Sequence, residues 1–178
     1  MGSSLGSTSD KTKYSRMLYF DPEADSLRKD DYYIRNEELT YKLNYLCDIN
    51  EEILKISIYK NPLNSIQLTN YIIYHAFVVF QTKCYWWSIE KNTEGITIQR
   101  SLFSKNVIQK YRQKERTSNI LNKVSLIIQA KGKGRVKDLI DLIYHKDLLF
   151  KDYSVIDNNC KNFAETIFNE CNCEGKIY

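Results

Sequence analysis

The fold is decided by the stretch Tyr71-Ile72-Ile73-Tyr74-His75-Ala76-Phe77-Val78-Val79-Phe80. Its β-branched and aromatic residues are typical of a strand. Because it lacks polar alternation, we expect this strand to be buried on both faces. Thr82-Lys83 follows as a two-residue turn, and residues 85–90 and 95–100 supply two further strands. Three strands joined by short connections predict an antiparallel β-meander.

Helices are expected on both sides of the meander in the sequence. Residues 36–55 carry a helical stripe of leucines, although residues 54–59 alternate as a short strand would. Residues 118–129 fit either period. After Gly132 and Gly134 the apolar residues fall at the spacing of an amphipathic helix: Val136, Leu139, Ile140 and Ile143. A last helix is predicted from about Asn159 to Glu170, which makes the fold class α+β.

Composition places limits on the architecture. The chain has 178 residues, 43% of them apolar, which suits one compact domain with appendages. We divide it into a disordered leader or expression remnant (1–16), a mainly helical N-terminal extension (17–68) and a catalytic domain (69–178). No apolar run approaches the roughly 20 residues of a transmembrane helix, and the start lacks a secretory signal. A cytoplasmic location with reduced cysteines is therefore expected.

The most informative site candidate is Cys160, in the run Asp157-Asn158-Asn159-Cys160-Lys161-Asn162-Phe163-Ala164. Three N-cap residue types precede it, so it falls in the first helical turn. There the backbone N–H groups and the helix dipole favour a thiolate. The alternative is a core residue, because Cys160 shares a helical face with apolar side chains.

His75 is the candidate base for that thiol. With a two-residue turn at Thr82-Lys83, strand register places His75 opposite Glu90, whose carboxylate would fix the imidazole tautomer. Cys160, His75 and Glu90 then form a nucleophile–base–acid arrangement. Ser88 and Gln81 are polar alternatives to Glu90 on the same face. The alternative for His75 is a hydrogen-bonded core histidine. Trp87 and Asn159 are candidate substrate contacts, with core packing as the alternative for the tryptophan.

The residues around these candidates resemble a known family. Tyr74-His75-Ala76-Phe77-Val78 and Asn158-Asn159-Cys160-Lys161-Asn162-Phe163-Ala164 are similar to the NlpC-type papain-like superfamily in its circularly permuted forms, which include lecithin:retinol acyltransferase-like and PPPDE groups. The resemblance spans about residues 70–172. It implies a half-barrel sheet packed on a cysteine-bearing helix, and a Cys–His hydrolase or acyltransferase that acts on amide, isopeptide or ester bonds through a thioester.

The same resemblance leaves two features without counterparts. Acyltransferase relatives usually carry a hydrophobic C-terminal anchor, whereas this sequence ends at Tyr178 without one. The residues before the sheet have no counterpart either. The expected substrate is an acyl, peptide or lipid group, and no cofactor or metal is expected.

A second class of function comes from charge. Residues 105–137 hold ten Lys or Arg residues against the single acid Glu115. This basic segment, with Lys131, Lys133 and Arg135 at its centre, suits an anionic membrane surface or RNA. The alternative function is thus an inactive binding or regulatory module, and the plainer interpretation is a solvated loop face. A metal site built from Cys160, Cys171, Cys173 and a histidine is a further alternative.

Overall fold

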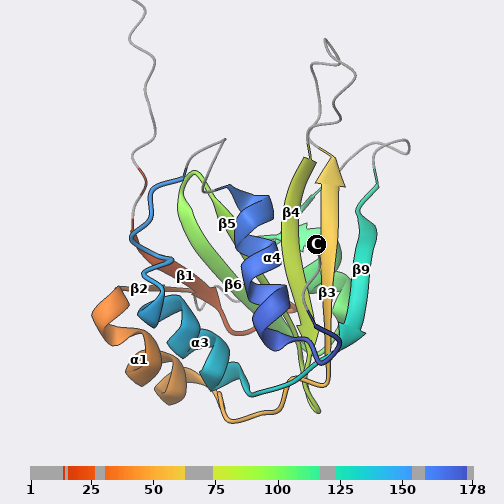
Figure 1. Cartoon of the computed structure of the whole chain (residues 1–178). Helices are drawn as coiled ribbons and strands as arrows, with labels where there is room; N and C mark the ends of the chain where they lie inside the picture. Colours follow the sequence, from red (N-terminus) through yellow and green to blue (C-terminus); the bar gives the residue numbers. More distant parts are fainter. Residues whose placement is uncertain are drawn as a thin grey trace, which may run out of the picture.

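The computed structural model describes Tyr14 and residues 16–26, 31–62, 74–116, 123–153 and 159–175. Its centre is a seven-stranded sheet in the order β2-β1-β6-β5-β4-β3-β9 (Figure 1). The strands are β1 (Leu18–Asp21), β2 (Tyr32–Ile34), β3 (Lys55–Pro62), β4 (Tyr74–Gln81), β5 (Trp86–Asn92), β6 (Gly95–Ser101) and β9 (Ser125–Lys131). A separate hairpin pairs β7 (Lys110–Tyr111) with β8 (Lys114–Glu115).

The predicted meander is present. Strands β4, β5 and β6 pair in sequence as antiparallel neighbours, and β3 and β9 extend the sheet antiparallel to them. Only the contact between β1 and β6 is parallel among the described strands. The chain is therefore an α+β protein with a mixed, mostly antiparallel sheet.

The register of β4 with β5 differs from the predicted one by two residues. Gln81 pairs with Trp86, so the connection is four residues long instead of two. Thr82 closes it, because its N–H donates to the Tyr85 carbonyl at 2.9 Å and its hydroxyl accepts from the Tyr85 N–H at 3.1 Å. The predicted pairing of His75 directly opposite Glu90 is wrong. A two-residue shift nevertheless keeps both side chains on the same face of the sheet.

The helices are η1 (Asn36–Glu38), α1 (Leu39–Leu46), α2 (Ser104–Gln109), α3 (Val136–His145) and α4 (Cys160–Cys171). The expected amphipathic helix after Gly134 and the last helix are confirmed. The expectation of a mainly helical extension over residues 17–68 is wrong, because this segment supplies β1, β2 and β3 to the common sheet. The alternation in residues 54–59 was the strand signal there.

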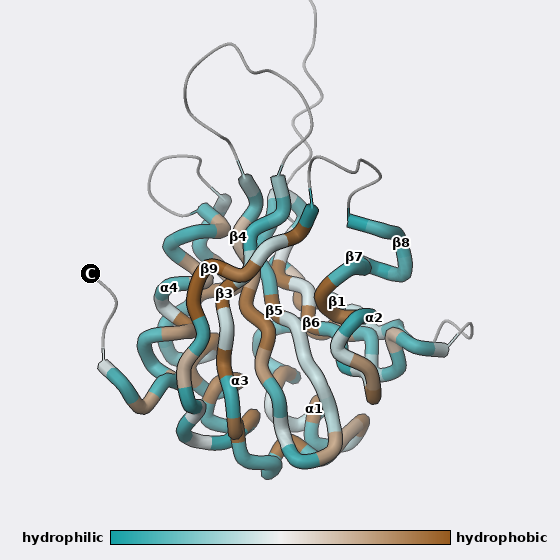
Figure 2. The backbone as a smooth tube through the Cα atoms, turned by 90° about the vertical axis from the view of Figure 1, so that its right-hand side faces the viewer, coloured by the Kyte–Doolittle hydropathy of each residue, from teal (hydrophilic) through white to brown (hydrophobic). Residues whose placement is uncertain are grey.

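The sheet has two unequal sides. The main core lies between the sheet and α1, α3 and α4, while a smaller cluster around Phe77, Val79 and Val107 lies under α2. Figure 2 looks along the sheet from its β9 edge, with α4 on one side and α2, β7 and β8 on the other. Within the described residues, no helix is both long and apolar enough to cross a membrane.

Candidate active site

Helix α4 begins at Cys160, and Asn159 caps it. The Asn159 side-chain oxygen accepts hydrogen bonds from the N–H groups of Lys161 and Asn162, each at 3.0 Å. Asn159 itself is extended, as an N-cap residue should be. The cap fixes the first turn of α4 and so the position of the thiol. Asn159, proposed from the sequence as a substrate contact, has this structural role in the described structure.

Asn159→Ala is expected to destabilise the protein by about 0.5–2 kcal/mol, because two N–H groups of the first turn lose their acceptor. Urea unfolding followed by tryptophan fluorescence measures this. Asn159→Asp is the matched control, since aspartate keeps the capping oxygen and should retain most of the stability. Equal stability of the alanine variant and the parent would contradict the capping role.

The Cys160 sulfur lies against the start of β4. The Ala76 N–H donates to Sγ at 3.5 Å, and His75 lies close enough to the same thiol to lower its pKa. Cys160 is 7% exposed, so it is nearly buried but reachable. The structure therefore brings together the predicted nucleophile and base, which are separated by 84 residues in the chain.

Glu90 completes the predicted set. His75 Nε2 lies 2.8 Å from Glu90 Oε2, and the Glu90 side chain is 2% exposed. Since Nε2 faces the carboxylate, the other ring nitrogen, Nδ1, is left for the thiol. A carboxylate on one nitrogen fixes the tautomer in which the opposite nitrogen can take a proton.

Arg116 is a site residue that the sequence reasoning missed. It follows β8, and its guanidinium binds Glu90 through two contacts, Nη1 to Oε2 at 2.9 Å and Nη2 to Oε1 at 2.5 Å. Both side chains are 2% exposed. The local sequence shows only another cation in the basic segment. The usable signal was Glu90 itself, predicted beside His75, because a carboxylate that is buried requires a cation.

Tyr153 is a second missed residue, and it lies near the Cys160 thiol. Burial, followed by the charge of the nearby Cys160, raises the pKa of Tyr153 to about 12. The connection that carries it is held by the fully buried Lys91, whose ammonium donates to the Leu148 carbonyl at 2.8 Å and also to the Lys151 carbonyl. Tyr153 thus places an O–H group near the Cys160 sulfur.

The electrostatics favour an ion pair between Cys160 and His75. Burial raises the pKa of Cys160, but hydrogen bonds from His75 and the Ala76 N–H outweigh it and lower this pKa to about 7. Burial lowers the pKa of His75, whereas its hydrogen bonds to Cys160 and Glu90 raise it, to about 9. Between these two values the thiol is ionised while the imidazole is still protonated.

The charge on Glu90 has its own cause. Burial raises the pKa of this carboxyl, but the charge and hydrogen bonds of Arg116, followed by those of His75, lower it to about 2. Glu90 is therefore anionic at every pH at which a thiol reacts. The site is an alternating row of charges from Cys160 through His75 and Glu90 to Arg116.

Trp87 does not belong to this site. It is 1% exposed and lies in the main core, where it stacks on Phe80 at 5.7 Å and on Phe20 at 6.2 Å between ring centroids. The expectation that it lines a substrate groove is corrected by this burial. The cause is the alternation of side chains along β5, because Trp87 points into the main core whereas Glu90 points to the side of the sheet that carries α2.

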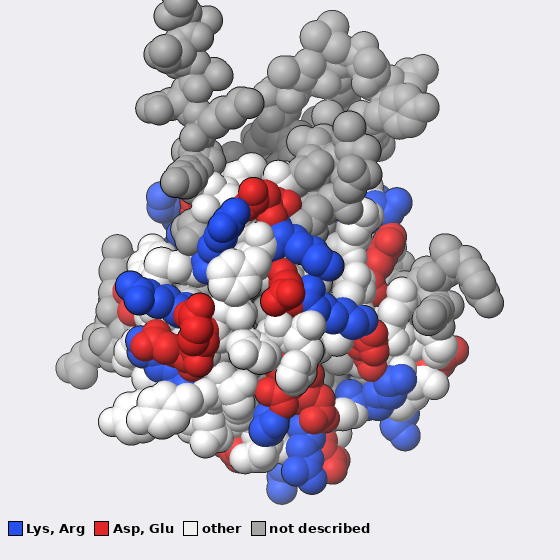
Figure 3. All heavy atoms as spheres, turned by 60° about the vertical axis from the view of Figure 1, so that its left-hand side comes forward, with Lys and Arg blue, Asp and Glu red and all other residues white. Residues whose placement is uncertain are grey.

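The basic segment does not form one patch. Arg116 is buried on Glu90, Arg112 pairs with Glu94, and Lys137 pairs with Asp141. Figure 3 shows Lys and Arg interspersed with Asp and Glu over the face it presents. Three of the ten cations of this run are therefore engaged in buried or surface ion pairs.

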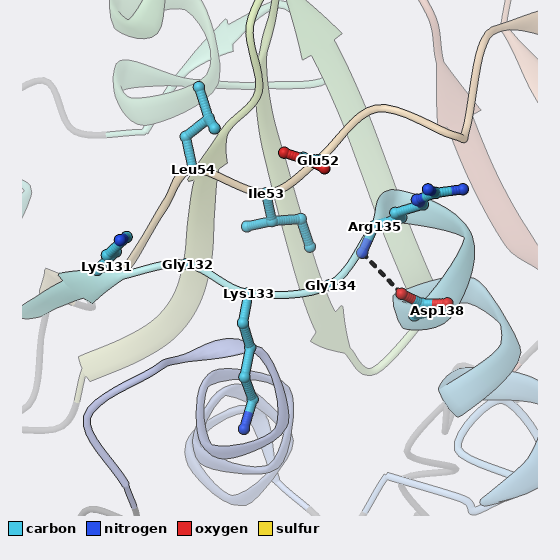
Figure 4. Close-up of a pocket in the computed structure, with 9 residues that line it drawn as sticks. All are labelled: Glu52, Ile53, Leu54, Lys131, Gly132, Lys133, Gly134, Arg135 and Asp138. Carbon is cyan, nitrogen blue, oxygen red and sulfur yellow. Dashed lines mark hydrogen bonds between the residues drawn. The ribbon is translucent and has the colours of Figure 1, made fainter.

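Lys131, Lys133 and Arg135 lie along the rim of a cavity of about 380 Å³ in front of α3. Figure 4 shows Lys133 pointing away from the other two, and the acids Glu52 and Asp138 also line the cavity. The N–H groups of Val136 and Lys137, which begin α3, already donate to the carbonyls of Glu51 and Ile49. The three cations do not converge on a common anion position.

The alternative metal site is not assembled. Cys160 and Cys171 lie at opposite ends of α4, about 16 Å apart at the helical rise. Cys173 instead donates its thiol to the Gly132 carbonyl at 3.0 Å. Among the residues that the structure describes, no group of three or more His, Cys, Asp or Glu is placed to hold a metal ion.

The chemistry available here is that of an activated thiol with a base, an acid partner for the base and a neighbouring O–H donor. Such a set can attack an electrophilic carbon and then protonate a leaving group. Comparisons with protein-family models, with curated proteins and with solved structures yield no match for this chain.

Proposed function

We propose that the protein is a cysteine-dependent hydrolase or acyltransferase that acts on an amide, isopeptide or ester bond through a thioester at Cys160. The observation that carries the proposal is the contiguous row Cys160–His75–Glu90, in which the thiol sits at a capped helix start. A core cysteine has no need of a histidine–carboxylate pair. The basic segment offers no comparable arrangement for the alternative binding function.

The proposed fold family is the circularly permuted papain-like one. The order of base before nucleophile supports it, as do the antiparallel strands β4, β5 and β6 and the contact of α4 with β4 and β5. Strands β1 and β2 stand outside that resemblance, since they extend the sheet beyond β6.

The mechanism follows from the roles of the groups. The Cys160 thiolate attacks the acyl carbon, and a tetrahedral intermediate forms. The start of α4 and the Tyr153 hydroxyl provide positive potential and a donor near the developing oxyanion. Protonated His75 then gives its proton to the leaving group, and the thioester passes to water or to a second acceptor that His75 deprotonates. Glu90 stabilises the imidazolium throughout.

The proposal is tested with p-nitrophenyl acetate, an activated ester that needs no knowledge of the natural acceptor. We expect acetylation of Cys160 in the parent, detected on its peptide by mass spectrometry, together with release of p-nitrophenol. Cys160→Ala should remove both signals. Cys84→Ala is the matched control, because Cys84 is an exposed cysteine remote from His75, and it should leave both unchanged. Equal turnover by Cys160→Ala would refute the proposal.

A further inference from the structure

We propose that Arg116 is a positioning residue for the Cys160–His75 pair, because its guanidinium holds both oxygens of Glu90 and keeps one of them on Nε2 of His75. The inference rests on the proposed thiol chemistry and extends it to a residue that does not touch the nucleophile. Its evidence is the geometry of a buried, two-contact ion pair.

The guanidinium is fixed from several sides. Its carbon lies 3.9 Å from the centroid of the Phe77 ring and 5.5 Å from that of Tyr111. The Arg116 N–H donates to the Gln109 carbonyl at 2.8 Å, and its carbonyl accepts from the Asn61 side chain at 3.3 Å. Stacking and backbone contacts together leave the planar group little freedom to turn away from the carboxylate.

Arg116 is also linked to His75 through strands β3 and β4 of the sheet. Asn61 is the register partner of His75 across β3 and β4. Its side chain binds the Arg116 carbonyl, so the strand pair that carries the imidazole also holds the arginine. The Asn61 contact therefore ties the backbone of Arg116 to the strand pair that carries His75.

The two partners of Glu90 share one oxygen. Oε2 accepts from both His75 Nε2 and Arg116 Nη1, whereas Oε1 is held by Arg116 Nη2. Rotation of the carboxylate away from His75 would break both arginine contacts at once. The two-contact geometry thus orients Oε2 of Glu90 toward His75 and also neutralises the charge of the carboxylate.

The charges around Glu90 show in which direction the loss of Arg116 would change the ionisation of the Cys160 thiol. Among the residues that the structure describes, the charged or titratable groups that face Glu90 are His75 from β4, Arg116 after β8 and Tyr111 from β7. Arg116 contributes more than His75 to keeping this buried carboxyl ionised. Without the arginine, burial favours the neutral acid, so Glu90 would take up a proton and His75 would lose its anionic partner. The thiol would then lose the imidazolium that stabilises its thiolate.

The test is the pH profile of Cys160 alkylation by iodoacetamide, read on the Cys160 peptide. In Arg116→Gln we expect the midpoint to rise by about one pH unit, a roughly tenfold loss of thiolate at low pH. Arg112→Gln is the matched control, because Arg112 lies on the same hairpin but pairs with Glu94. It should keep the parent midpoint. An unchanged or lowered midpoint in Arg116→Gln would overturn the inference.

A variant pair separates positioning from mere support of the fold. If Arg116 acts through Glu90, then Glu90→Gln and the double variant Glu90→Gln/Arg116→Gln should share one raised midpoint. A further rise in the double variant would mean that Arg116 acts by another route. The ring signals of the two histidines, assigned by NMR with the help of His75→Ala, should show a lowered His75 pKa in Arg116→Gln.

The experiment distinguishes failure of the proposed function from failure of the inference about Arg116. If the parent thiol titrates as an ordinary cysteine, the proposed function fails before Arg116 is considered. If the parent midpoint is low and depends on His75 but not on Arg116, only this inference fails. Should Arg116→Gln not fold, Arg116→Lys replaces it, since lysine keeps the charge but not the two-point hold. Its midpoint should also rise, and a parent value would overturn the inference.

Discussion

His75→Ala is expected to move the midpoint of Cys160 alkylation from about pH 7 to at least about pH 8.5, the value of an unperturbed cysteine. The physical reason is that His75 supplies both the hydrogen bond and the positive charge that oppose the burial of the thiol. Once both are gone, burial acts alone on a sulfur that is 7% exposed. The shift therefore has a defined sign, upward.

The midpoint is the appropriate measurement, since a single rate is ambiguous. A thiolate of low pKa is intrinsically less nucleophilic, so part of the gain in ionised fraction is offset in the rate at any one pH. The profile should also fall into two steps in the parent. Thiolate appears near pH 7, and the paired imidazolium is lost near pH 9. In His75→Ala only the step in which the thiolate forms should remain, because the imidazole is absent.

Two controls complete this experiment. His145→Ala removes the other histidine, which ends α3, and should leave the Cys160 profile unchanged. The exposed Cys84 in the same digest provides an internal reference for an ordinary thiol. If His75→Ala and the parent share one midpoint, then Cys160 is a core cysteine and the proposed chemistry is wrong.

The sequence located Cys160, His75 and Glu90 because each lies on a locally readable element. Cap-forming residues identify the helix start, and β-branched residues identify the strand. Glu90 was reached through a register that was wrong by two residues, and the assignment survived because side chains alternate with a period of two. An error of one residue would have put Ile89 or Lys91 in its place.

Arg116 and Tyr153 could not be found in this way. Arg116 reaches Glu90 only because the β7–β8 hairpin folds back over the sheet, and Tyr153 reaches Cys160 through a connection that Lys91 holds. Neither arrangement leaves a periodic signal in the chain. The strands β1 and β2 are four and three residues long, too short for alternation to be recognised. The parallel pairing of β1 with β6 is a long-range choice that no local pattern encodes.

Trp87→Ala is expected to lower the free energy of unfolding by about 3–5 kcal/mol, because it removes a large aromatic ring from a close-packed core. Trp87 is 1% exposed and stacked between Phe20 and Phe80. The loss should appear in urea denaturation, while the alkylation midpoint of Cys160 in the still-folded protein stays at the parent value. A substrate-groove residue would show the opposite pattern, with stability retained and turnover lost.

Two neighbouring substitutions make that result specific. Trp86→Ala removes the same ring from the opposite face of β5, where the residue is only partly buried, and should cost clearly less. Trp87→Phe retains an aromatic ring and eliminates the indole N–H, which is buried without a hydrogen-bond partner. Its cost should be the smallest of the three, since losing an unpaired buried donor offsets part of the lost packing. If Trp86→Ala were the most damaging, the smaller cluster under α2 would hold the fold together, and the assignment of Trp87 to the dominant core would fail.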